Sequence, residues 1–137
     1  SRSYFLDEIA AAMGGYAAEK MVFRDITTGP HNDLERASDL ARDLVTRYGM
    51  SEKLGPAVFG ERQELVFLGK EIASEKNYSE EIARLIDREV RRIINTALAR
   101  AKNILTERRE KLETIAKRLI EKETIERGEF ETLMAVA

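Results

Sequence analysis

The sequence contains no cysteine, a single histidine and two prolines. Without cysteine the chain has no disulfide framework, thiolate zinc site, iron–sulfur cluster or cysteine nucleophile, and His31 alone excludes any site needing two histidines from this chain. No apolar run approaches the roughly 18 residues of a membrane span. No charged and then apolar signal peptide opens the chain. We therefore expect a soluble segment that makes no membrane contact of its own.

An excess of charge of one sign is also lacking, since 23 Lys and Arg residues stand against 25 Asp and Glu residues. This balance provides no global field that would draw the chain onto DNA or an anionic membrane. Arg88, Arg91, Arg92 and Arg100 form one basic flank, but aromatic residues are scarce and not interleaved with it. Binding to nucleic acid is therefore not expected. Neither Gly-x-Gly-x-x-Gly nor a Walker loop occurs, so no nucleotide site follows from the sequence.

The 137 residues suffice for one domain with a real core, and 43% of them are apolar. The charged fraction of 35% is high, as expected when long helices carry solvated faces. The chain begins at Ser1 rather than at methionine, and we expect a fragment of a longer protein.

Apolar residues recur at three- and four-residue steps, which predicts amphipathic helices separated by loops. The predicted helices cover about 3–20, 32–48, some 25 residues after Ser79, 112–120 and 129–134. Pro30 and Pro56 mark loops, and residues 50–77 predict a loop with one short strand or hairpin around Leu65-Val66-Phe67-Leu68. The predicted fold class is mainly α over 1–137, with the third and fourth helices forming an antiparallel pair.

Capping residues support these helix boundaries. We predict Ser3 as the N-cap of the first helix and Gly49 as the C-cap of the second, and Asn77 and Ser79 provide capping side chains for the third. The pair Gly14-Gly15 lies inside the first helix, where each glycine costs about 1 kcal/mol relative to alanine. We expect close backbone packing there to offset this cost.

Asp33 is the main candidate for chemistry, because a Gly/Pro loop turns into a helix just before it. In one interpretation Asn32 or Asp33 caps the helix and meets its dipole favourably. In the other, Asp33 is a metal ligand held in a fixed direction by the helix start. A catalytic zinc usually needs three protein ligands, often two histidines and one carboxylate, and this chain cannot supply two histidines. Both interpretations remain open from spacing alone.

Other candidates have simpler explanations. His31 and Asp33 would point about 200° apart if both were helical, so one ion could not readily bind both. Ser51, Thr27 and Thr28 have no nearby base, and turn or cap roles account for them. The Glu and Arg residues of the third and fourth helices are expected to make weak surface ion pairs.

Several ordered blocks nevertheless add up to a family resemblance. They are Gly14-Gly15-Tyr16-Ala17-Ala18-Glu19, Asp25-Ile26-Thr27-Thr28-Gly29, Asn32-Asp33-Leu34-Glu35-Arg36-Ala37, Tyr48-Gly49-Met50-Ser51-Glu52-Lys53-Leu54-Gly55-Pro56, Val66-Phe67-Leu68-Gly69 and Asn77-Tyr78-Ser79-Glu80. Together they resemble the peptidase domain of the FtsH family, the membrane-anchored ATP-dependent zinc metalloproteases. The resemblance implies that Asp33, in the Asn-Asp-Leu-x-x-Ala block, is the third zinc ligand.

The resemblance also implies what lies outside the chain. The family's His-Glu-x-x-His helix, with two zinc ligands and the general-base Glu, is expected upstream of Ser1, as are the ATPase module and the membrane segments. By this resemblance 1–137 is the C-terminal part of a zinc-metallopeptidase domain. Three residues depart from the family pattern: Tyr16 replaces Arg, Arg24 replaces Gly, and His31 replaces a small residue. Arg24 puts in question any turn with φ > 0 there.

The implied parent protein is an ATP-dependent zinc metalloendopeptidase that degrades membrane and soluble proteins. Its cofactors would be Zn2+ at the peptidase site and ATP with Mg2+ in the ATPase module. It would form a six-membered ring, anchored in a bacterial inner membrane or an organelle membrane, with the peptidase domain in the cytoplasm or organelle. This chain would supply Asp33 and a helical scaffold, and would be inactive alone.

The competing class is a non-catalytic helical interaction or oligomerisation module. In that case the same apolar stripes would support a partner surface, and Asp33 would be a helix-start residue only. An intact His-Glu-x-x-His segment upstream would favour the protease, and its loss would favour the interaction module.

Overall fold

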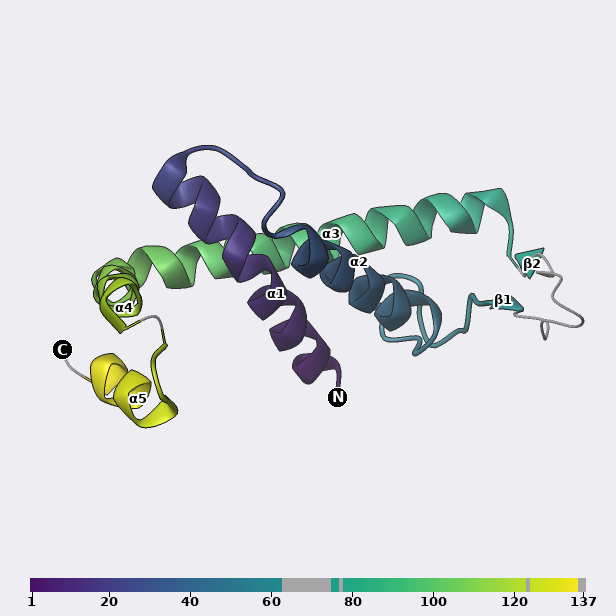
Figure 1. Ribbon diagram of the computed structural model, residues 1–137. Coiled ribbons are helices and arrows are strands. Elements are labelled where there is room, and N and C mark those ends of the chain that lie inside the picture. Colours follow the sequence, from purple (N-terminus) through teal and green to yellow (C-terminus); the bar gives the residue numbers. More distant parts are fainter. Residues whose placement is uncertain (63–74, 77, 123, 136–137) are drawn as a thin grey trace, which may run out of the picture.

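The computed structural model describes residues 1–62, 75–76, 78–122 and 124–135. Within these ranges the chain forms five helices and one two-stranded antiparallel sheet (Figure 1). The elements are α1 (Arg2–Phe23), α2 (His31–Thr46), β1 (Glu61–Arg62), β2 (Glu75–Lys76), α3 (Glu80–Glu107), α4 (Arg109–Lys122) and α5 (Arg127–Ala135). The predicted mainly α class is confirmed, and the two short strands lie within the segment that was predicted to contain a short strand or hairpin. The Leu65-Val66-Phe67-Leu68 run, which was expected to form a strand, and the capping residue Asn77 lie outside the described residues.

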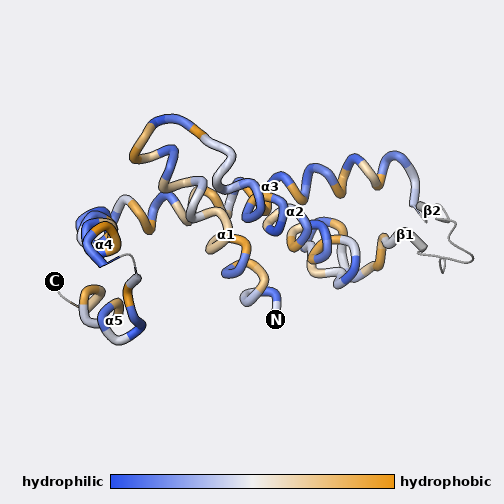
Figure 2. Tube along the Cα trace, in the orientation of Figure 1, coloured by the Kyte–Doolittle hydropathy of each residue, from blue (hydrophilic) through white to orange (hydrophobic). Residues whose placement is uncertain are grey.

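The core lies between α1, α2 and α3, and α1 packs on both of the other helices. In Figure 2 the tube of α3 alternates between hydrophobic and hydrophilic colours along its length, as expected for an amphipathic helix. Such a helix has one apolar face that can be buried against other helices. The buried apolar residues are Ile9, Ala10, Ala12, Met13, Ala17, Ala37, Ala41, Leu44, Val45, Ile86, Val90, Ile93, Ala97 and Ala101. Each large one among them contributes about 1.5–3 kcal/mol. No helix in the described part of the chain is long and apolar enough to cross a membrane.

The helix starts follow the predicted capping chemistry, with one correction. Ser79 caps α3, and its Oγ accepts a hydrogen bond from the backbone N–H of Ile82 at 3.2 Å. The N-cap of α1 is Ser1 and not Ser3: the Ser1 Oγ accepts from the N–H of Tyr4 at 3.2 Å. A cap side chain reaches an N–H two or three residues further on, and Ser3 is already inside the first turn.

The end of α2 depends on Gly49, as predicted, although the helix ends at Thr46 and not at 48. The N–H of Met50 donates to the carbonyl of Leu44 at 3.0 Å, which breaks the regular helical pattern. Gly49 has φ 59°, in the left-handed region that favours glycine. A Cβ at this position would lie 3.1 Å from the backbone N of Ala57, so the close approach of the following loop also requires glycine.

The predicted antiparallel pairing of the third and fourth helices is wrong. In Figure 1, α3 runs across the picture while α4 is seen end-on beyond its C-terminal end, and the two meet only near their junction. A single residue, Arg108, separates them, whereas two antiparallel helices need a connection of about two to five residues. The apolar stripe of α3 is covered by α1 and α2 instead.

Helix α4 packs on α5. Arg118 pairs with Glu129, Lys122 with Glu129 at 3.4 Å, and the ammonium of Lys111 donates to the carbonyl of Met134. None of the described residues of α4 and α5 is buried. This pair of helices is therefore held on the end of α3 with much apolar surface exposed, including Ile120 at 82%.

A buried carboxylate ties the loop after α2 to α3. Glu89 is 3% exposed, although its helix was expected to carry its acidic residues on solvated faces. Its Oε2 accepts from the Ser51 hydroxyl at 2.8 Å, and its two oxygens accept from the Arg92 guanidinium at 2.9 and 3.0 Å. The hydrogen bonds from Arg92 hold the pKa of the Glu89 carboxyl below its usual value, against the effect of burial. Ser51 also accepts from the N–H of Leu54, the turn role predicted for it.

Candidate metal-binding site

Asp33 lies in the first turn of α2, where its side chain is exposed. A Cβ built on Gly15 of α1 would lie 3.7 Å from its Oδ2, so the carboxylate sits over the glycine. The N-cap of α2 is Pro30, and neither Asn32 nor Asp33 makes a side-chain capping hydrogen bond. Among the described residues the Asp33 carboxylate has no hydrogen bond or ion pair. A capping hydrogen bond therefore does not account for Asp33, although its charge in the first turn of α2 still meets the helix dipole favourably, and its oxygens are available to a ligand.

Glu19 of α1 fixes the loop that leads into α2. Its Oε2 accepts from the N–H of Thr27 at 3.3 Å, and its Oε1 accepts from the Thr27 hydroxyl. The same Thr27 Oγ accepts from the N–H of Gly29 at 3.1 Å. Glu19 lies one helical turn after Gly15, the glycine next to Asp33. Its hydrogen bonds to Thr27 therefore hold the loop, and with it the start of α2, against this part of α1. The turn role of Thr27 is confirmed, but sequence reasoning missed Glu19, since a helical glutamate carries no signal of a tertiary partner.

Two residues that depart from the family pattern lie within α1 and at its C-terminal end. Arg24 ends α1 with φ 54° and ψ 24°, so the left-handed turn forms although no glycine is present. A residue with a Cβ pays about 1–2 kcal/mol for that conformation. Tyr16 is partly buried against the core cluster.

His31 is the first residue of α2 and is exposed. Because His31 and Asp33 are two residues apart in one helix, their side chains diverge by about 200° and do not converge on one ion. Across the described residues no group of three or more His, Cys, Asp or Glu side chains could hold a metal ion. The candidate metal ligand that the described residues offer at this place is therefore the single carboxylate of Asp33.

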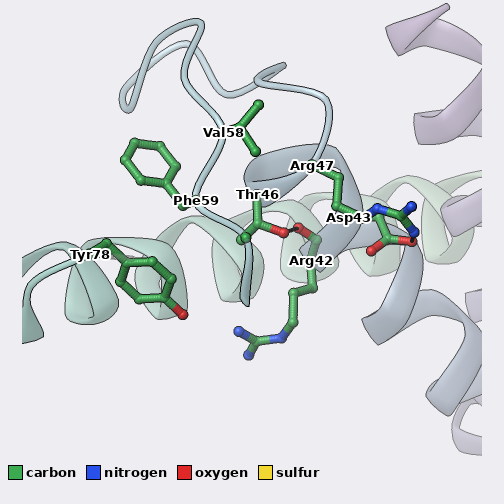
Figure 3. Close-up of a pocket in the computed structure, with 8 residues that line it drawn as sticks. Arg42, Asp43, Thr46, Arg47, Val58, Phe59 and Tyr78 are labelled. Carbon is green, nitrogen blue, oxygen red and sulfur yellow. Dashed lines mark hydrogen bonds and ion pairs between the residues drawn. The ribbon is translucent and has the colours of Figure 1, made fainter. Parts of the chain in front are cut away.

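A cleft of about 740 Å³ opens at the other end of α2 (Figure 3). Arg42 and Arg47 line it, and each is paired, with Asp87 at 3.4 Å and Asp43 at 3.9 Å. Phe59 and Tyr78 meet edge to face across it, with ring centroids 6.3 Å apart. Ten residues of helix, about 15 Å, separate Asp33 from this cleft, so the cleft does not contribute to the site at Asp33.

Comparison with known proteins assigns the chain to a class of peptidases. The family model of Peptidase family M41 matches residues 1–133, nearly the whole chain. The chain therefore belongs to Peptidase family M41. The predicted resemblance to the FtsH family is confirmed by individual relatives.

The chain is 52% identical over 133 residues to ATP-dependent zinc metalloprotease FtsH 1 of Sphaerobacter thermophilus, covering 97% of this chain and 20% of that protein. It is 47% identical over 135 residues to ATP-dependent zinc metalloprotease FtsH of Thermotoga maritima, covering 98% and 22%. The FtsH of Bacillus subtilis is 48% identical over 130 residues, covering 94% and 20%. The chain thus spans about a fifth of the length of the relatives it matches.

Proposed function

We propose that this chain is part of an ATP-dependent zinc metalloendopeptidase and that Asp33 is a zinc ligand in its active site. The observation that carries the proposal is the Asp33 carboxylate, unpaired among the described residues and lying over Gly15. The names of the relatives support the zinc-dependent and ATP-dependent chemistry.

The residues present can supply one ligand of a zinc site. Carboxylate oxygen is a normal zinc ligand, and the absence of a side chain at Gly15 leaves space beside Oδ2 for an ion. The chemistry that zinc supplies at such a site is activation of a water molecule and polarisation of the peptide carbonyl under attack. The two histidine ligands and the general-base glutamate would come from a His-Glu-x-x-His helix outside this chain.

The chain's own residues orient the carboxylate. The Glu19–Thr27 hydrogen bonds hold the loop against α1. The buried Pro30 then starts α2, and its carbonyl accepts from the N–H of Leu34 at 2.9 Å. Asp33 is thereby fixed on a rigid helical turn, as a metal ligand must be for precise coordination.

The test is Asp33→Asn in the complete gene product. Asparagine keeps the size of the side chain but removes its charge, so we expect bound zinc to fall at least tenfold and casein degradation to be lost. Asp39→Asn is the matched control, because Asp39 is an exposed aspartate on the same helix. Unchanged zinc content in Asp33→Asn would show that Asp33 is not a ligand.

The proposal extends to the whole protein. We infer that ATP and Mg2+ act in a separate ATPase module, that protein substrates are degraded, and that six copies form a ring anchored to a membrane. The exposed apolar side chains of α4 and α5 support a role for these helices in contacts between copies. The 137 residues alone are expected to cleave no casein, and chelator-sensitive cleavage by them would contradict the proposal.

A further inference from the structure

A hollow surface with arginine and aromatic side chains lies along α2 and α3. The cleft of about 740 Å³ at the end of α2 adjoins a groove of about 270 Å³ between α2 and α3, because Arg42 lines both. Together they are here called the α2–α3 groove. Three arginines, two aromatic residues and one aliphatic residue define it: Arg42, Arg47, Arg91, Phe59, Tyr78 and Ile94. The groove therefore combines cationic and apolar chemistry on one surface.

The three arginines of the groove carry more hydrogen-bond donors than the described residues use. A guanidinium has five N–H donors. Among the described residues, Arg42 donates one long hydrogen bond to Asp87 at 3.4 Å, and Arg47 lies 3.9 Å from Asp43 without a hydrogen bond between them. The guanidinium of Arg91 has no hydrogen bond or ion pair within the described part of the chain. The remaining donors suit the oxygens of carboxylates supplied by a ligand.

Apolar side chains line one end of the groove. In Figure 3 the ring of Phe59 comes from the loop before β1, and that of Tyr78 from the residues that lead into α3. The two rings meet edge to face, and Val58 beside them is 65% exposed. Arginine and aromatic residues are the types that are enriched where proteins bind one another. This end of the groove therefore suits an aromatic or aliphatic side chain of a bound peptide.

The length and the charge of the groove indicate what it binds. From the start of α3 to Ile94 the helix rises about 21 Å, which an extended chain covers in about six or seven residues. Three arginines face two aspartates, a positive excess that suits a few carboxylates but not nucleic acid, whose binding depends on neutralising many phosphates. We propose that the α2–α3 groove binds an extended acidic segment of a protein substrate, with an apolar side chain against Phe59 and Tyr78 and carboxylates on the arginines. This inference rests on the proposed function, which makes proteins the substrates.

The first test measures peptide binding to the complete gene product by fluorescence anisotropy. The probe is a fluorescein-labelled peptide with a phenylalanine followed by alternating glutamate and alanine, and the control peptide has lysine in place of glutamate. We expect the control peptide to bind about tenfold more weakly or less, and the probe to bind more weakly as salt is added. Equal binding of the two peptides would overturn the proposal.

The arginines are tested by a double variant, Arg42→Gln with Arg91→Gln. Both side chains lie on the surface, so the fold should lose less than about 1 kcal/mol of stability. We expect the affinity for the probe to fall about tenfold, because two guanidinium groups lose their contacts with carboxylates. Arg127→Gln is the matched control, at an arginine of α5 that is 92% exposed, and should leave the affinity unchanged. An unchanged affinity in the double variant would show that the groove is not the binding site.

The second test identifies the occupant of the groove. In the complete gene product, Val58→Cys is labelled with a short thiol-reactive photo-crosslinker, and the captured molecule is identified by mass spectrometry. We expect capture of the probe peptide. Thr132→Cys, at an exposed position of α5, is the matched control and should not capture it. Capture of a second copy of this chain in place of the peptide, or no capture of the peptide, would overturn the proposal.

The third test separates this inference from the proposed function. With a protein substrate that carries the probe sequence, the double variant should raise KM and leave kcat unchanged. Asp33→Asn should lose zinc but bind the probe as the wild type does. If Asp33→Asn loses zinc and the double variant keeps its KM, the groove proposal fails and the proposed function stands. If Asp33→Asn keeps zinc, the proposed function fails, and the assignment of the bound segment to a protease substrate fails with it.

Discussion

Glu89→Gln removes one charge from a buried cluster and should weaken the fold measurably. The Glu89 carboxylate, 3% exposed, accepts three hydrogen bonds, one from Ser51 and two from Arg92. A glutamine amide has one oxygen, so one Arg92 donor loses its acceptor. A hydrogen bond to a charged group contributes about 1.5–3 kcal/mol, but Arg92 is 42% exposed and can be rehydrated. We expect a loss of about 1–2 kcal/mol in the free energy of unfolding at pH 7.

The pH dependence of this loss follows from the lowered pKa of Glu89. Because the native pKa lies below the ordinary value of 4.5, the unfolded chain binds more protons than the native chain between the two values. The stabilisation by the Glu89 charge is complete above pH 4.5 and is lost as the pH falls through the native pKa. The difference between the wild type and Glu89→Gln should therefore shrink on acidification.

Urea unfolding followed by circular dichroism at pH 7 and at decreasing pH below 4.5 measures both effects. Glu113→Gln is the control, because the Arg109–Glu113 pair is exposed and should contribute less than about 1 kcal/mol at any pH. A Glu89→Gln variant as stable as the control at pH 7, or a difference that grows on acidification, would refute the reasoning.

Two further predictions concern the loop before α2. Arg24→Gly should raise the free energy of unfolding by about 1 kcal/mol, because glycine adopts the left-handed conformation at φ 54° without the strain that a Cβ causes. Arg24→Ala keeps a Cβ and should not raise it. Equal melting temperatures for the two variants would contradict this prediction. Glu19→Ala should cost about 1–2 kcal/mol in urea unfolding by releasing Thr27, and should weaken zinc retention in the complete protein without abolishing it. Glu35→Ala, an exposed glutamate on α2, should change neither quantity.

The sequence determined the elements of this fold because their causes are local. Apolar spacing predicted α1, α2 and α3, and Ile9, Leu44 and Ile86 from those apolar stripes are buried, whereas Leu85 and Ile104 on α3 are 37% and 45% exposed. The capping chemistry of Ser79 and the left-handed glycine at Gly49 likewise depend on neighbours a few residues away. The family followed from ordered blocks of residues and needed no coordinates.

The sequence placed Asp33 at a helix start but could not decide between a cap and a ligand. The structure shows that neither side chain caps α2 by a hydrogen bond, and the ligand role of Asp33 stays a proposal that rests on the position of its carboxylate over Gly15, on another helix 18 residues earlier in the chain. Glu19 and Glu89 were missed for the same reason, since their partners Thr27 and Ser51 lie on other segments.

Only the tertiary structure decided which helix faces are covered. Amphipathic spacing says that α3 and α4 each have an apolar face, but not against what it packs. The single residue Arg108 directs α4 away from α3, and α1 and α2 occupy the stripe that α4 was expected to cover. Periodicity reports how apolar side chains are arranged around one helix, while the choice of partner depends on chain connection and on the sum of all contacts. For this reason the elements and the family could be predicted from the sequence, and the packing partner of each helix could not.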